Sequence, residues 1–244
     1  MLKRILLVAL VIVILLVGGF VIWASTTNPL MPEAQASLAG TSLVSVTDDG
    51  FIEFMPNDVQ PNTGLILYPG GKVLPGAYAP MALSVAEEGY YAAIVYAPLN
   101  LAFFNVNAAQ AVIDAHPEIE HWVVGGHSLG GVAAALFAQS NTSVEGLVLM
   151  ASYPANDGLS SREDLDAVSI YGTQDGLANV TTIQDSKNLL PASAEFVAIE
   201  GGNHGQFGYY GDQSGDNPAT ISRDDQQSQV VAAIISLLDR VSGE

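Results

Sequence analysis

Hydrophobic and polar positions divide the chain into one long apolar run followed by a regular alternation. The run from Ile5 to Ala24 carries no charged residue. Beyond it, short continuous apolar runs that end at glycine or proline alternate with stretches whose apolar residues recur at helical spacing. Continuous apolar strands separated by helices are typical of a parallel sheet buried on both faces, so the pattern predicts an α/β domain with a mostly parallel sheet.

The short runs predict strands at 43–46, 51–55, 64–68, 90–96, 121–124, 146–151, 167–171 and 195–199. The first two flank Asp49 and Gly50, a pair typical of a β-hairpin. Helices are expected at 78–88, 107–115, 129–139, 180–190 and 222–238. Ligands of such sheets bind beyond the carboxyl ends of the strands, so reactive residues are sought in the loops after them.

The N-terminal run is long enough to cross a bilayer. Its twenty residues would form a helix of about 30 Å, the thickness of the hydrocarbon core. Lys3 and Arg4 precede it, which favours a cytoplasmic N-terminus, and Trp23 stands where an interfacial aromatic residue belongs. We therefore expect an uncleaved membrane anchor over residues 1–24, with the remainder on the extracytoplasmic side.

A cleaved signal peptide is the alternative interpretation. Its apolar region would be longer than usual, and the nearest Ala-x-Ala site, Ala34 to Ala36, lies far beyond the run. Cleavage would give a secreted form. Small, polar and proline residues dominate positions 25–42, which predicts a linker before a single globular domain at 43–244.

Composition narrows the function. Hydrophobic residues make up 49% of the chain, enough for a packed core, and the net charge of −18 disfavours binding to nucleic-acid phosphates. The chain has no cysteine, which excludes disulfides, thiolate metal sites and cysteine nucleophiles.

Residues 126–130 read Gly-His-Ser-Leu-Gly, a G-x-S-x-G pattern between a predicted strand and a predicted helix. On such a strand-turn-helix the sharp turn exposes the hydroxyl of Ser128, and glycine permits the close approach of neighbouring backbone. The following helix N-terminus offers partial positive charge to a developing oxyanion.

A serine hydroxyl becomes a nucleophile when a base takes its proton and an acceptor orients that base. Asp175 and His204 both stand in polar, glycine-rich loops that directly follow predicted strands. The chain order of serine, aspartate and histidine matches one of the known orders of such triads.

The stretch from about Gly64 to His204 resembles the α/β-hydrolase fold superfamily. The motifs that carry the resemblance are YPGG, GGHSLGG, YGTQDG and GGNHGQFG, after the third, fifth, seventh and eighth strands. The chain looks most like compact, cap-less bacterial hydrolases related to dienelactone hydrolases and esterases.

The resemblance implies roles for particular residues. Ser128 would be the nucleophile, His204 the general base and acid, and Asp175 the carboxylate that orients His204. The backbone N–H of Leu129 would be one oxyanion donor, and that of Gly71 or Lys72 the second. The loop Pro69-Gly70-Gly71-Lys72 departs from the His-Gly of many esterases.

Other residues compete for these roles. Asp157, after the sixth predicted strand, is the rival acid, and Asp175 would then only cap a helix. His127 is expected to point into the fold. His116 and His121 resemble a metal pair, but their spacing of five and the intervening Pro117 do not suit a zinc-binding helix, so no metal is expected.

Apolar residues follow the fourth strand and the base. Leu101, Phe103 and Phe207 are candidates for a substrate pocket, and packing against the core is the alternative. The sequence thus predicts a serine hydrolase without a cofactor, acting on a small-molecule or lipid-like carboxylic ester. Thioester, lipid or peptide cleavage by the same triad, and a non-catalytic binding protein on this fold, remain open.

Overall fold

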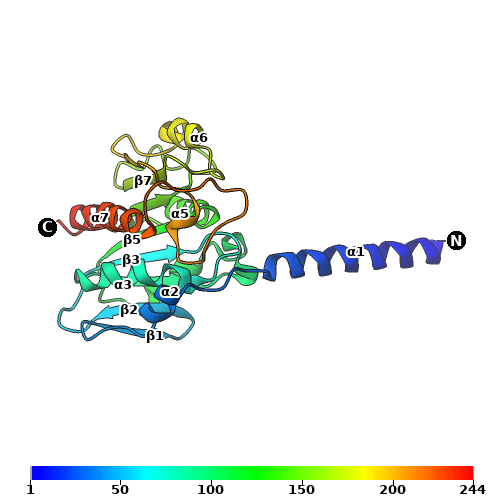
Figure 1. Cartoon of the computed structure of the whole chain (residues 1–244), viewed down its shortest axis with the longest axis horizontal. Coiled ribbons are helices and arrows are strands. Elements are labelled where there is room, and N and C mark those ends of the chain that lie inside the picture. The colour runs from blue at the N-terminus through cyan, green and yellow to red at the C-terminus, as the bar shows by residue number, and fades with distance from the viewer. Residues whose placement is uncertain (1, 244) are drawn as a thin grey trace.

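The computed structural model describes residues 2–243, so positions 1 and 244 of the expected anchor and domain lie outside the described residues. A long helix, α1 (Leu2–Ser25), projects from an α/β domain and has the length and composition to cross a membrane (Figure 1). Within its membrane-length stretch no residue is buried in the protein. The helix therefore offers its apolar surface to the surroundings along almost its whole length.

An eight-stranded sheet forms the centre of the domain. The strands are β1 (Val44–Asp48), β2 (Phe51–Pro56), β3 (Thr63–Tyr68), β4 (Tyr91–Val95), β5 (His121–His127), β6 (Val144–Met150), β7 (Asp166–Gly172) and β8 (Glu195–Ile199). Their order is β1-β2-β4-β3-β5-β6-β7-β8. β1 and β2 form the expected hairpin, β2 pairs antiparallel with β4, and all other pairs are parallel. The sheet is mostly parallel, as the sequence predicted.

Helices cover both faces of the sheet. The longer ones in the domain are α3 (Ala79–Glu87), α4 (Ala108–Ala115), α5 (Leu129–Ser140), α6 (Val180–Asp185) and α7 (Arg223–Ser242). Short 3-10 turns are η1 (Pro75–Tyr78), η2 (Pro98–Asn100), η3 (Ala102–Asn105), η4 (Ser186–Leu189) and η5 (Gly205–Phe207). These elements lie close to the predicted positions, and η2 and η3 fill the connection after β4.

Alternate residues of the central strands build two separate cores. On β3, Leu65 and Leu67 pack with α3 and α7, whereas Ile66 and Tyr68 pack on the opposite face with α4 and α5. All six residues of β3 are buried. Burial on both faces explains why the strand is a continuous apolar run and not an alternating one.

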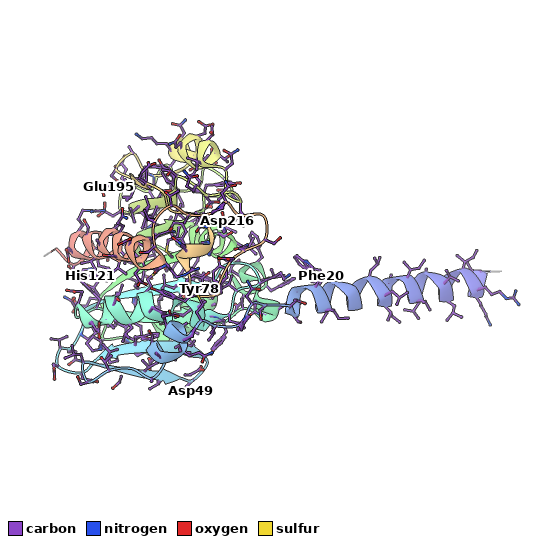
Figure 2. All side chains as sticks on the ribbon, in the orientation of Figure 1. Phe20, Asp49, Tyr78, His121, Glu195 and Asp216 are labelled. Carbon is purple, nitrogen blue, oxygen red and sulfur yellow. The ribbon has the colours of Figure 1, made fainter. Side chains whose placement is uncertain are left out.

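The carboxyl ends of the parallel strands face the end of the domain from which α1 emerges. β5 begins at His121, at the end far from α1, and leads towards Phe20 and the helix (Figure 2). The other parallel strands run in the same direction. The loops that follow them therefore gather beside the base of α1.

Residues 25–42 differ from the expected linker. A short helix, α2 (Pro32–Ser37), packs against α3, and Ala34 is fully buried. Leu30 and Leu38 pack against the core on either side of it. Ala34 within the helix and Leu30 and Leu38 on its two sides bury apolar surface, and this burial outweighs the small, polar composition that suggested a linker.

Candidate active site

Ser128 occupies a strained turn between β5 and α5. Its φ of 52° and ψ of −121° lie outside the regions that side-chain-bearing residues favour. A Cβ added to Gly126 would come within 2.3 Å of the backbone of Gly130, and one added to Gly130 would come within 2.2 Å of the Tyr68 carbonyl oxygen. Both glycines of the motif are thus required by the close approach of backbone, as the sequence predicted.

Hydrogen bonds hold this turn in place. The Ser128 N–H donates to the Met150 carbonyl at 2.9 Å, and the Ser128 carbonyl accepts from the Ser152 hydroxyl at 2.7 Å. The N–H of Gly131 donates to the same carbonyl at 3.0 Å, which begins α5. The half-buried Ser128 side chain is therefore presented at the N-terminus of α5, where the helix dipole favours negative charge.

Asp175 and His204 are in direct contact. His204 Nδ1 lies 2.8 Å from Asp175 Oδ2, and the two side chains are 2% and 0% exposed. The other oxygen, Asp175 Oδ1, accepts from the N–H groups of Leu177 at 2.8 Å and Ala178 at 2.7 Å. A carboxylate held on both oxygens fixes the orientation of the imidazole. Its acceptor oxygen favours a proton on Nδ1, so Nε2 can accept a proton from another group.

His204 also lies beside the turn that bears Ser128. Its ring centroid is 4.4 Å from that of His127, the residue before Ser128. Within residues 2–243 no hydrogen bond joins the Ser128 hydroxyl to His204. Such contacts commonly tighten when substrate binds, so the arrangement is compatible with a nucleophile and its base.

Asp216 connects the loop of the acid to the loop of the base. Its Oδ1 accepts from the N–H of Gly176 at 2.9 Å, and its Oδ2 accepts from the N–H of Gly205 at 2.8 Å. These amides belong to the residues directly after Asp175 and His204. One carboxylate therefore sets the separation of the two loops.

Two side chains from α7 hold the His204 loop from the other side. Gln226, fully buried, accepts from the N–H of Asn203 at 3.0 Å and donates to its carbonyl at 2.8 Å. The Arg223 guanidinium donates to the carbonyls of Gly205 and Gly208. The backbone around His204 is thus held by side chains that do not themselves reach Ser128.

His127 points into the fold, as expected. It is 1% exposed, and its Nδ1 lies 2.9 Å from the Tyr78 hydroxyl, which accepts from the N–H of Gly70 at 2.9 Å. Burial holds the pKa of His127 well below its usual range, and the nearby His204 lowers it further. Because His127 stays neutral in the interior, His204 is the imidazole beside Ser128 that is available for proton transfer.

The backbone N–H groups near Ser128 differ in whether they already donate a hydrogen bond. The N–H of Gly70 is bound to Tyr78, and that of Lys72 donates to the Asn100 carbonyl at 2.8 Å. The N–H groups of Gly71 and Leu129 have no such partner in the described part of the chain. A Cβ added to Gly71 would lie 3.2 Å from the Leu129 side chain, so the two residues adjoin. Of the two alternatives for the second oxyanion donor, Gly71 suits the geometry and Lys72 does not.

The three pocket candidates lie in different surroundings. Leu101 is half-buried and adjoins Gly71, and Phe103 is 48% exposed at the same end of the sheet. Phe207 is fully buried and stacks on His127 with ring centroids 5.6 Å apart. Phe207 therefore belongs to the core, the alternative that the sequence left open.

The residues that the sequence offered as an alternative acid or as metal ligands lie elsewhere in the domain. Asp157 is exposed after β6, while Asp175 occupies the Nδ1 side of His204. His116 contacts Glu53 and Glu118, and His121 contacts Glu145. No group of three potential metal ligands occurs within residues 2–243.

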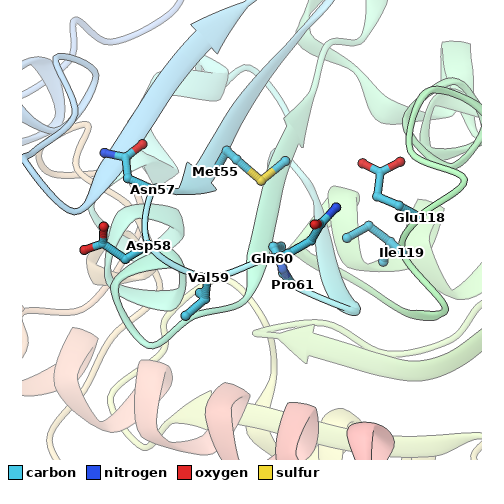
Figure 3. Close-up of a pocket in the computed structure, with 8 residues that line it drawn as sticks. All are labelled: Met55, Asn57, Asp58, Val59, Gln60, Pro61, Glu118 and Ile119. Carbon is cyan, nitrogen blue, oxygen red and sulfur yellow. The ribbon is translucent and has the colours of Figure 1, made fainter.

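A hollow of about 370 Å³ lies at the opposite end of the sheet, before β3 and β5 (Figure 3). It is lined by Met55, Asn57, Asp58, Val59, Gln60, Pro61, Glu118 and Ile119. Because Ile119 precedes β5, whose other end leads to Ser128, this hollow is not part of the candidate active site.

Sequence reasoning did not identify Asp216, Tyr78, Arg223 or Gln226. Asp216 was difficult to identify from its position in the chain, because it is one acidic residue in a glycine-rich stretch that the superfamily pattern does not include. Its role depends on two loops that only the folded chain brings together.

The chain belongs to the alpha/beta hydrolase family, whose pattern matches residues 64–228, more than half of its length. The match extends from β3 into α7 and includes the loops of Ser128, Asp175 and His204. The family assignment makes the protein a hydrolase of the α/β-hydrolase fold. Comparison with curated proteins finds no match.

Solved structures share the same architecture. The esterase domain of a Rhodothermus marinus protein superimposes with a TM-score of 0.60 at 14% identity, covering 81% of this chain and 97% of its own. TT1662 from Thermus thermophilus gives 0.58 at 12% identity, covering 80% and 98%. At these identities the similarity establishes the fold, and 640 solved chains share it, so the fold by itself does not select a substrate.

Proposed function

We propose that this α/β-hydrolase is a serine hydrolase that cleaves carboxylic esters through an acyl-enzyme. Ser128 attacks the ester carbonyl while His204 Nε2 takes the hydroxyl proton. Asp175 keeps the imidazole oriented and stabilises its protonated form. His204 then returns the proton to the leaving alcohol, and a water molecule, deprotonated by the same imidazole, releases the acid.

The oxyanion of each tetrahedral intermediate is assigned to the N–H groups of Leu129 and Gly71. Both amides are free of other partners in residues 2–243, and both adjoin the turn of Ser128. Fixed donors of this kind stabilise charge that develops only in the transition state.

The observation that carries the proposal is the buried 2.8 Å contact between Asp175 and His204 beside the strained turn of Ser128. A binding protein would have no need to keep a carboxylate, an imidazole and a strained serine together. The esterase activity named for the Rhodothermus marinus domain favours an ester as the bond cleaved. Cleavage of thioesters or amides by the same residues is the second candidate reaction.

Turnover of simple substrates tests the proposal. We expect p-nitrophenyl esters to be hydrolysed, and Ser128→Ala to remove the activity while the circular dichroism spectrum stays unchanged. Faster cleavage of matched thioesters or peptide amides would move the assignment to those bonds. Full activity in Ser128→Ala would contradict it.

We also propose that α1 is retained as a membrane anchor with the domain on the extracytoplasmic side. The absence of charge between Ile5 and Ala24, the preceding Lys3 and Arg4, and the length of α1 support this placement. Recovery of the full chain in the membrane fraction after an alkaline wash checks it, and recovery of a shortened, soluble chain would contradict it.

A further inference from the structure

Exposed apolar side chains gather around the candidate active site. In the domain, five large hydrophobic residues that follow carboxyl ends of strands are exposed: Tyr96, Phe103, Phe104, Tyr153 and Leu177. Phe104 is 55% exposed and Leu177 is 41% exposed. Leu177 donates its N–H to Asp175, and Tyr153 follows Ser152, which holds the turn of Ser128. Leu177 and Tyr153 therefore border the loops of Asp175 and Ser128, whereas the Tyr96 hydroxyl donates to Asp48 at 2.8 Å.

The base of α1 is joined to the same end of the domain. The Phe20 and Phe104 rings meet edge to face with centroids 6.3 Å apart, and Lys72 Nζ lies 4.6 Å from the centre of the Trp23 ring. Further on, the N–H of Met31 donates to the Tyr209 carbonyl at 3.0 Å. The helix and the domain are thus in direct contact, with no free tether that would let the domain turn away.

These contacts set the level of the domain relative to a membrane. Phe20 lies inside the apolar run, four residues before Ala24, which is about 6 Å along a helix axis. Aromatic side chains at such a depth occupy the boundary between headgroups and acyl chains. Phe104, packed beside Phe20, reaches the same level.

We propose that the active-site end of the domain rests on the surface of the bilayer that α1 enters, with Phe103, Phe104 and Leu177 in the interfacial region. The inference deepens the proposed function, because it takes α1 as the retained anchor and Ser128 as the nucleophile. Apolar contact carries the docking, since a chain with a net charge of −18 gains nothing from anionic headgroups.

The docking also indicates the class of substrate. A hollow of about 360 Å³ lies between Thr26 and Asn28, just after α1, and the loop of Gly71 and Lys72. It thus adjoins both the base of the anchor and the assigned oxyanion donor. An ester whose acyl chain resides in the bilayer would reach Ser128 from this side.

Fluorescence quenching in nanodiscs tests the docking on the full chain. The protein has no cysteine, so a single cysteine introduced at any position is a unique labelling site. Phe104→Cys and Leu177→Cys would carry an NBD fluorophore at the proposed interface. Val59→Cys is the matched control, because Val59 is 52% exposed and lines the hollow at the opposite end of the sheet. A fluorophore on Ile12→Cys, in the middle of α1, measures the quenching expected in the bilayer interior.

In phosphatidylcholine nanodiscs containing a nitroxide-labelled lipid, we expect quenching at 104 and 177 to exceed that at 59 by at least about twofold, with strong quenching at 12. Strong quenching at 12 with 104 and 177 no different from 59 would overturn the docking. Absence of quenching at 12 would overturn the docking and the anchor together. Reaction of Ser128 with a fluorophosphonate, measured on the same nanodiscs, reports separately on the hydrolase proposal.

Discussion

At the residue scale, the proposed chemistry depends on the buried pair of Asp175 and His204. An asparagine at 175 would keep the size of the side chain but would offer an amide, which favours the wrong tautomer of the imidazole. We expect Asp175→Asn to lower kcat by about three to four orders of magnitude. Ester hydrolysis measured under substrate saturation checks this.

The exposed Asp157 is the matched control for that substitution. Asp157→Asn should leave kcat within about twofold of the parent, because a solvated carboxylate outside the site contributes little to the transition state. The reverse ranking of the two variants would place the catalytic acid after β6.

The second buried imidazole makes a prediction about stability. The pKa of His127 is depressed in the folded protein and ordinary in the unfolded chain, so below about pH 6.5 the unfolded chain binds a proton that the native state does not. This contribution to stability is present above the unfolded pKa and is lost as the pH falls through the folded pKa.

Replacing His127 removes that dependence. We expect His127→Gln to have a shallower fall in unfolding free energy between about pH 6.5 and pH 5 than the parent, by up to about 1.4 kcal/mol per pH unit. Urea denaturation at a series of pH values measures the slope. Equal slopes would mean that His127 is protonated in the folded protein.

At the scale of elements, the site depends on loops that are held by one another. Asp216 accepts from the amides of Gly176 and Gly205, so its carboxylate ties the loop after β7 to the loop after β8. An asparagine supplies one oxygen acceptor and turns an N–H₂ group towards the other amide. The two loops should then separate slightly.

We expect Asp216→Asn to lower kcat/KM between about tenfold and a hundredfold, the range for a small misplacement of reacting groups. Asp212→Asn, an exposed carboxylate on the same loop, is the control and should change little. Urea denaturation of the same variants separates positioning from stability, because a displaced pair of Asp175 and His204 lowers the rate without a matching loss in the free energy of unfolding. An unchanged rate would leave Asp216 with a structural role only.

At the scale of the whole molecule, the segment 30–38 packs against the domain. Leu30, Ala34 and Leu38 bury apolar surface against it. A fragment comprising residues 26–244 should therefore be more stable than one comprising 43–244, by about 2 kcal/mol or more. Thermal unfolding of the two fragments measures the difference, and equal melting temperatures would return the segment to the role of a linker.

The sequence predicted those parts of the fold that depend on neighbouring residues. The continuous apolar run of β3 and the G-x-S-x-G turn around Ser128 are local patterns, and both were confirmed by the architecture. Asp175 and His204 could be expected at one edge of the sheet because each stands in the loop after a strand, and parallel strands end together.

The remaining features depend on contacts between distant parts of the chain. Asp216 acts on amides forty and eleven positions away, and Tyr78 reaches His127 across forty-nine. No periodicity encodes such pairs. The short helix at 32–37 was not predicted because its residues are small and polar, and its apolar contacts come from Ala34 and from Leu30 and Leu38 on either side of it.

The central claim is that Ser128 is an activated nucleophile. The most direct measurement treats the fragment 26–244, which lacks α1, with a fluorophosphonate and follows the intact mass and the peptide map. We predict a single adduct on Ser128 that His204→Ala greatly slows, because the imidazole must take the hydroxyl proton. A folded protein that forms no adduct, or forms it elsewhere, would contradict the account.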